Sequence, residues 1–144
     1  MKRFNLIWAV ALCLLFTAGC SDKIIPNTEL PIEAQTFIKT YFPEVPISYA
    51  KKDYEGLSYK YEVRLNDGTE INFSKKGVWD KVDCQMSEVP AALIPQMIAN
   101  YVQTNYAGSV IVKIDKERYG HQIELSNDLE FKFDKNGNLF DIDD

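Results

Sequence analysis

Apolar and polar residues alternate along one stretch of the chain, and the same alternation returns 60 residues later. Residues 59–79 read YKYEVRLNDGTEINFSKKGVW and residues 119–139 read YGHQIELSNDLEFKFDKNGNL. Aligned without gaps, the copies match at these positions: Tyr59 with Tyr119, Val63 with Ile123, Leu65 with Leu125, Glu70 with Glu130, Phe73 with Phe133 and Gly77 with Gly137. An apolar residue at every second position indicates a strand with one buried face. We therefore expect each copy to form antiparallel strands that share an apolar face.

The first turn of each copy follows from which side chains must share that face. The segment Asn66–Gly68 contains an Asp-Gly pair, which is typical of a two-residue hairpin turn. That turn would place Arg64 opposite Ile71, and so a charged residue on the buried face. A three-residue loop places Val63 opposite Ile71 instead and keeps the apolar residues together, because a slip of one residue turns every side chain to the other face. We predict the three-residue loop, with a left-handed backbone at Gly68.

The second turn follows the same logic and pairs Phe73 with Trp79, which places Trp79 on the core face. Val82 lies three residues beyond Trp79, and residues three apart do not share a strand face, so a bulge or a strand end is expected between them in both copies. On the polar face, Glu70 is expected opposite Arg64.

The equivalent pair in the second copy is Glu124 opposite Glu130, which is like-charged. Like charges directly opposite each other are destabilising. The pairing is therefore mildly disfavoured unless a basic neighbour such as Lys132 lies beside it.

A helical pattern precedes the strands in each copy. Pro31 suits the first turn of a helix, where its missing N–H has no partner to lose, and Pro95 has the same place in the second copy. Apolar residues on one helical face follow: Ala34, Phe37, Ile38, Tyr41 and Phe42, then Ile98, Tyr101, Val102 and Tyr106 at an offset of 64. A strand is expected after each helix, at residues 47–52 and 110–116. Because the offset falls from 64 to 60, we place four extra residues of the first copy in a loop at 53–56.

These elements predict an α+β fold in which an α-β-β-β-β unit occurs twice, at residues 30–86 and 87–144, within one continuous domain. Each unit has one apolar helix stripe and one apolar sheet face, and the two should pack together with the helices on one face of an antiparallel sheet. Two unrelated halves would not produce so many aligned positions.

Residues 1–19 have the basic start, short apolar run and small-residue end of a secretory signal, and the run is too short to span a membrane. The Thr-Ala-Gly-Cys sequence that ends at Cys20 resembles the lipobox of bacterial lipoproteins, with threonine in place of the usual leucine. The resemblance implies cleavage before Cys20, lipidation of Cys20 and a tether at residues 20–29. The protein would then be exported and anchored in the cell envelope, in the periplasm or at the outer membrane. An ordinary signal peptide with an incidental cysteine is the alternative.

Charge and cysteine content narrow the possible partners. Without Lys2 and Arg3 of the signal, 14 basic residues stand against 21 acidic ones, a net charge of −7. This charge argues against nucleic-acid binding, which needs a basic footprint. It suits a basic partner, or a soluble body held off an anionic membrane. Cys13 leaves with the signal and Cys20 is lipidated, so Cys84 has no disulfide partner and the fold must depend on its core.

The sequence contains no recognised pattern of catalytic residues. The one histidine, His121, aligns with Tyr61 on the apolar strand face and is expected to pack there. No local Ser-His-Asp signature, zinc-ligand spacing or Gly-rich phosphate loop occurs, so we predict no catalytic residue, no metal and no cofactor. Residues 134–138 have some likeness to the start of a calcium loop, but glycine is not sixth and the chain continues as a strand, which predicts a turn.

Together these features resemble the PepSY-like family of β-lactamase-inhibitor-like envelope proteins. The likeness rests on the lipoprotein-type signal, two copies of a Leu/Ile-Pro helix with an aromatic end, and two copies of a Tyr-x-(Tyr/His)-x-(Val/Ile)-x-Leu strand with a Phe-x-x-x-Gly turn. It covers about residues 30–144. It implies helices on one side of a continuous antiparallel sheet. It also implies a protein partner, because β-lactamase inhibitor proteins bind an enzyme on a concave sheet surface and PepSY domains are associated with restraint of peptidases. A fold alone does not fix function.

Tyr49 and Tyr54 are the candidate binding residues, because the second copy has no aromatic residue at either place and aromatic residues are enriched at interfaces. Packing in the core or a loop is the alternative for each tyrosine. The sequence thus predicts a non-enzymatic, lipid-anchored envelope protein that binds another protein, such as a hydrolase or peptidase that it would inhibit. A small-molecule or carbohydrate binding module is the alternative, and a hydrolase without a recognised signature is the third hypothesis.

Overall fold

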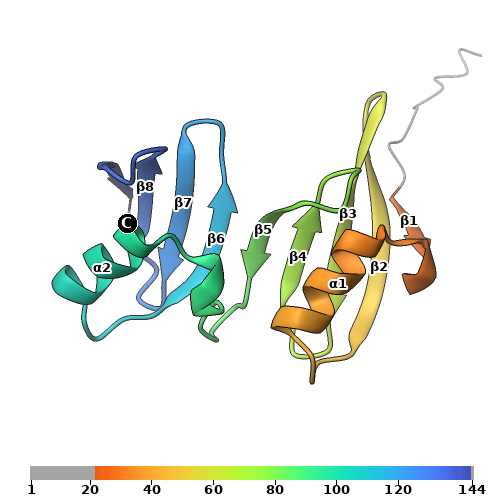
Figure 1. The fold of residues 1–144 in the computed structure, drawn as a ribbon, viewed down its shortest axis with the longest axis horizontal. Coiled ribbons are helices and arrows are strands. Elements are labelled where there is room, and N and C mark those ends of the chain that lie inside the picture. Colours follow the sequence, from red (N-terminus) through yellow and green to blue (C-terminus); the bar gives the residue numbers. More distant parts are fainter. Residues whose placement is uncertain (1–21, 144) are drawn as a thin grey trace, which may run out of the picture.

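The computed structural model describes residues 22–143 and shows an α+β fold with two α-helices on one antiparallel sheet of nine strands (Figure 1). The strands lie in the sheet in the order in which they occur in the chain. Their bounds are β1 Lys23–Ile25, β2 Ile47–Glu55, β3 Ser58–Leu65, β4 Glu70–Phe73, β5 Trp79–Asp83, β6 Ile111–Lys116, β7 Gly120–Leu125, β8 Glu130–Asp134 and β9 Leu139–Asp143. The helices are α1 Ile32–Tyr41 and α2 Gln96–Asn105, with single 3-10 turns at Asn27–Glu29 and Ala91–Leu93.

A helix followed by four strands occurs twice, as the repeated pattern predicts. The two halves share one sheet because β5 pairs with β6. Both helices begin after a proline, at Pro31 and Pro95. They cover the same face of the sheet (Figure 1), where the ring of Phe37 on α1 lies 5.5 Å from that of Phe73 on β4.

The strand registers confirm the parity argument. Val63 lies opposite Ile71, and Leu65 N–H donates to Thr69 O at 2.8 Å, which closes a three-residue loop. Gly68 has φ +92° and its counterpart Asp128 has φ +68°, so the left-handed residue is present in both copies. Trp79 pairs with Phe73.

The predicted bulge is also present in both copies. The register shifts at equivalent places in the β4–β5 and β8–β9 pairs. As expected, Trp79 packs, half-buried, against the core.

Two expectations about the first half were wrong. The first strand does not end at residue 52, because β2 continues to Glu55 and the extra residues lengthen the β2–β3 hairpin, which projects beyond its neighbours (Figure 1). Residues 53–55 continue the alternation of side chains between the two faces and pair with β3, so they extend the strand and do not form a loop. The segment expected as a tether contains β1, which pairs with β2, and Ile25 is buried there. A strand of three residues is too short to show a period.

The expected signal segment and Cys20 lie outside the described residues. Within residues 22–143, no helix combines the length and apolar character that crossing a membrane requires.

Candidate functional site

The face of the sheet that the helices leave uncovered, here called the helix-free face, carries a set of charged side chains that the strands align. Side chains alternate along each strand, so apolar residues meet the helices and polar residues point away. Strand pairing aligns the charged residues of this face in rows across the strands. At the paired positions they are Lys51, Asp53, Glu55, Lys60, Glu62, Arg64, Glu70, Lys81 and Asp83 on β2–β5, and Lys113, Asp115, Glu124, Glu130, Lys132, Asp134, Asp141 and Asp143 on β6–β9.

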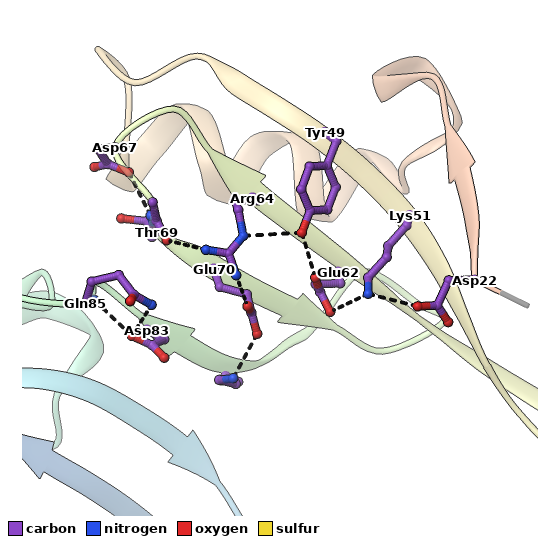
Figure 2. A network of polar contacts seen from close by, with 12 residues as sticks. Asp22, Tyr49, Lys51, Glu62, Arg64, Asp67, Thr69, Glu70, Asp83 and Gln85 are labelled. Atoms are coloured by element: carbon purple, nitrogen blue, oxygen red, sulfur yellow. Dashed lines mark hydrogen bonds and ion pairs between the residues drawn. The ribbon is translucent and has the colours of Figure 1, made fainter.

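In the first half, a network of polar contacts crosses the strands (Figure 2). Lys51 Nζ lies 3.0 Å from Asp22 Oδ2 and 3.1 Å from Glu62 Oε2. The hydrogen bond to Asp22 is the main reason that the pKa of Lys51 is raised. Tyr49 OH donates to Glu62 Oε1 at 3.2 Å and accepts from Arg64 Nε at 3.3 Å. Tyr49 therefore belongs to the helix-free face, where its hydroxyl joins an acid to a base.

Glu70 is the centre of the next part of the network. Its carboxylate accepts a hydrogen bond from Arg64 on β3 and another from Lys81 Nζ on β5, at 2.8 Å. Burial alone would raise the pKa of Glu70, but the bond and charge of Lys81, followed by the charge of Arg64, outweigh burial and lower it. The predicted pairing of Glu70 with Arg64 is confirmed.

The equivalent position in the second half has no such balance. Glu124 lies opposite Glu130 as the register required. We expected Lys132 to be the basic neighbour of this like-charged pair. The basic neighbour is instead Lys113, whose Nζ lies 3.6 Å from Glu124 Oε2. Gln122 Nε2 donates to Glu130 Oε2 at 2.8 Å. Lys132 is held instead by two carboxylates of β9.

Charge is therefore distributed unequally over the helix-free face. At the paired positions, the β2–β5 half has four basic and five acidic side chains, and the β6–β9 half has two basic and six acidic ones. Two equivalent positions change sign, because Arg64 and Lys81 in the first half correspond to Glu124 and Asp141 in the second, whereas Glu70 and Glu130 are both acidic. The β6–β9 half, here called the acidic half, is a surface that attracts basic groups.

The structure separates the two candidate tyrosines. Tyr54 lies on the helix-covered side of the long hairpin, where its ring centroid is 5.7 Å from that of Tyr59. It is 37 % exposed. Tyr49 lies on the opposite face, so the pair cannot form one site.

The residues considered for chemistry have structural surroundings. His121 is half-buried opposite Phe133, and burial followed by the charge of Lys116 lowers its pKa. Cys84 is buried, which raises the pKa of its thiol to about 11. Asp134 Oδ1 accepts the N–H groups of Asn136 and Asn138, which confirms the expected turn. Residues 22–143 contain no group of three His, Cys, Asp or Glu side chains placed to hold a metal ion.

A hollow of about 270 Å³ lies between α2 and the start of β6. Two residues that line the hollow differ from their counterparts in the first half, which lie 64 residues earlier in the chain. Ala99 and Ser109 line the hollow, whereas the first half has Gln35, whose Nε2 donates to Leu30 O, and Val45, which packs on the core. Smaller side chains in the second half thus leave space that the first half fills.

The fold and this face define a two-layer α+β protein whose sheet is covered by helices on one side only. The chain belongs to the PepSY-like family: residues 59–141 match the family model described as "Putative beta-lactamase-inhibitor-like, PepSY-like".

Three crystal structures are similar to it, each with a TM-score of 0.82. One is a "putative calcium-regulated periplasmic protein" from Bacteroides thetaiotaomicron, 41 % identical over 85 % of this chain and 97 % of that one. The others are from Bacteroides vulgatus ATCC 8482. One is a "putative periplasmic protein", 40 % identical over 88 % of this chain and 99 % of that one. The other is a "putative periplasmic protein of unknown function", 34 % identical over 86 % and 100 %. No curated protein matches the sequence.

The acidic half was not predicted when the two copies within the chain were aligned. Its signal was already visible at the offset of 60, because Arg64 aligns with Glu124 and Lys81 with Asp141. The alignment identified the core, and the aromatic differences drew attention to Tyr49 and Tyr54. The charge differences between the copies contained the stronger information on a surface.

Proposed function

We propose that the protein is a non-enzymatic envelope protein, anchored by a lipid on Cys20, that binds another protein through the acidic half of its helix-free face. The observation that carries the proposal is the like-charged pair of Glu124 and Glu130 on adjacent strands, where the first half has Arg64 opposite Glu70. Like charges on adjacent strands are destabilising, so folding alone does not favour this pair. A partner with a basic surface would relieve the repulsion.

Two further observations support this function. The relatives are described as periplasmic proteins, which agrees with an exported chain. The name of the family refers to inhibitors that act on an enzyme, so a hydrolase or peptidase with a basic surface is the partner class that we propose. Complementary charge accelerates association and makes it dependent on salt.

The proposal is tested by neutralising two acids in each half. Glu124→Gln with Glu130→Gln alters the acidic half, and Asp53→Asn with Glu62→Gln is the matched control in the β2–β5 half. Both double variants change the net charge equally, so non-specific attraction falls equally in both. Cross-linking in envelope extract should recover a partner with wild type and with the control, and much less with the acidic-half variant. Equal recovery with both variants would exclude the acidic half.

The lipid anchor has its own test. Cys20→Ser should release the protein from the membrane fraction, because the acyl chains on Cys20 are its proposed attachment to the membrane. Unchanged membrane association would contradict the anchor without affecting the proposed binding surface.

The hollow beside α2 supports a second candidate, a small-molecule or carbohydrate module. Its volume of about 270 Å³ is just below the range of about 300–1,000 Å³ of ligand pockets. Ala99→Gln should fill it as Gln35 fills the equivalent place. A small molecule that raises the Tm of wild type but not of Ala99→Gln, with no protein partner recovered, would favour this candidate over the first.

A further inference from the structure

The last strand, β9, is the geometric counterpart of β5. Val82 of β5 lies opposite Ile71 of β4, and Ile142 of β9 lies opposite Phe131 of β8. Both pairs of strands contain the same register shift at the same place. The strand that pairs with the outer edge of β5 therefore indicates what kind of strand would fit the outer edge of β9.

The outer edge of β5 is covered and that of β9 is not. β6 pairs along β5 and places Ile114 opposite Val82. In residues 22–143, no strand pairs with the outer edge of β9. The consequence is visible in burial, because Val82 is 0 % exposed whereas Ile142 is 47 % exposed. An edge with free backbone N–H and C=O groups is a template for another strand.

The charges beside Ile142 specify which strand would fit. On β5, Lys81 lies opposite Asp115 and Asp83 lies opposite Lys113, so each charge meets its opposite. On β9 the equivalent positions are both acidic, Asp141 and Asp143, and Lys132 Nζ of β8 contacts both carboxylates, so the three side chains together carry one excess negative charge. The complementary strand therefore has a basic residue, an apolar residue and a basic residue in succession, with the apolar one over Ile142.

A second copy of the chain does not meet this requirement. Antiparallel pairing of two β9 strands about Ile142 would place Asp141 of each copy opposite Asp143 of the other, and like charges in that position are destabilising. The opposite edge of the sheet, β1, offers Lys23, Ile24 and Ile25, which have no basic-apolar-basic alternation. The two acids thus disfavour self-association and favour a basic partner strand.

We propose that the outer edge of β9 is a strand-addition site for an extended segment of a partner protein with the pattern basic-apolar-basic. Main-chain hydrogen bonds would supply affinity, and the alternating side chains would supply specificity, as in other cases of β-augmentation. This site shares Asp141 and Asp143 with the acidic half but depends on the backbone edge of β9. The variants at Glu124 and Glu130 and those at Asp141 and Asp143 therefore test the two proposals separately.

The test uses the full-length protein in detergent and a short peptide of alternating lysine and valine. Isothermal titration should show binding, and hydrogen exchange should show slower exchange of the amides at residues 139–143. The variant Asp141→Asn with Asp143→Asn should weaken binding about 2- to 30-fold, since two opposite-charge pairs are lost. The matched control is Asp53→Asn with Glu55→Gln at the far side of the sheet, which should bind as wild type does.

Two modified peptides separate strand addition from simple attraction of charge. A peptide N-methylated along its pairing edge has the same charge but cannot donate to the strand, and a glutamate–valine peptide has the opposite charge. Neither should bind. The proposal fails if the methylated peptide binds equally well, if the control variant weakens binding as much as the β9 variant, or if no binding and no protection of residues 139–143 is seen. It also fails if sedimentation shows that a second copy already occupies the edge.

Discussion

Replacing Glu70 by glutamine is expected to destabilise the protein, because Glu70 joins three strands through ionic hydrogen bonds. Its side chain is only 16 % exposed, and those of Arg64 and Lys81 are 34 % and 25 % exposed. Hydrogen bonds to charged groups contribute about 1.5–3 kcal/mol when buried, and exposed ion pairs about 0.2–1 kcal/mol. With partial exposure we take about 1 kcal/mol for each bond. Glutamine retains an acceptor, so the expected loss is about 1.5 kcal/mol. For about 120 ordered residues, this lowers Tm by about 6 °C.

The matched control is Glu130→Gln at the equivalent place. Glu130 faces Glu124 and accepts from the neutral Gln122, so removing its charge should leave stability unchanged or raise it by about 0.5 kcal/mol. Urea unfolding at pH 7 measures both variants.

The effect of Glu70→Gln should also depend on pH. The folded pKa of Glu70 lies below its ordinary value of 4.5. Its contribution is therefore present above that value and is lost as pH falls through the folded pKa. The difference between wild type and Glu70→Gln should shrink between pH 7 and pH 3. Equal losses for the variants at Glu70 and Glu130, or a loss that does not change with pH, would refute the reasoning.

Three further predictions concern single residues. Gly77→Ala should cost about 3 kcal/mol and Gly137→Ala about 1.5 kcal/mol by urea unfolding, although both glycines have φ near +80°. The new Cβ at residue 77 would lie 2.7 Å from Pro31 Cβ and 3.1 Å from the backbone N of Ala34, whereas the new Cβ at residue 137 would meet only Met97, at 3.0 Å from its Cβ. Similar losses would contradict this. Cys84 should react with a thiol reagent at pH 8 only after unfolding, because it is buried with a pKa of about 11; rapid labelling of the native protein would exclude that burial. Glu124→Arg should leave stability within about 0.5 kcal/mol of wild type, because a new pair with Glu130 is offset by the loss of the ion pair with Lys113, which lies opposite; a larger gain in Tm would count against this balance.

The sequence predicted the core of the protein well, because alternation and parity are local and occur twice. Val63 could face Ile71 only through a three-residue loop, and both registers followed from that one constraint. β1 could not be predicted, since three residues have no period. The end of β2 was misplaced because a loop and a longer hairpin account equally well for four extra residues.

The sites depend on relations between elements that are distant in the sequence. Predicting the hollow beside α2 requires the distance between a helix and a later strand. Predicting the free edge of β9 requires the order of all nine strands. Tyr54 was assigned to binding from its lack of a counterpart, but its face of the sheet depends on the length of the hairpin. Only the charge contrast between Arg64 and Glu124 could have been read from the aligned copies.

The two halves agree in the buried core and differ on the helix-free face. Buried positions keep their apolar character, for example Ile71 and Phe131, which are both 0 % exposed. Two charged positions of the helix-free face change sign, since Arg64 and Lys81 correspond to Glu124 and Asp141, although the backbone register is the same in both copies. Asp141 has Lys132 as its own partner, but Glu124 lies opposite Glu130 where the first half has an ion pair. The pair of Glu124 and Glu130 forgoes a stabilisation of about 1 kcal/mol. A group outside the described residues, positively charged and held against β6–β9, is the physical condition under which those acids become favourable.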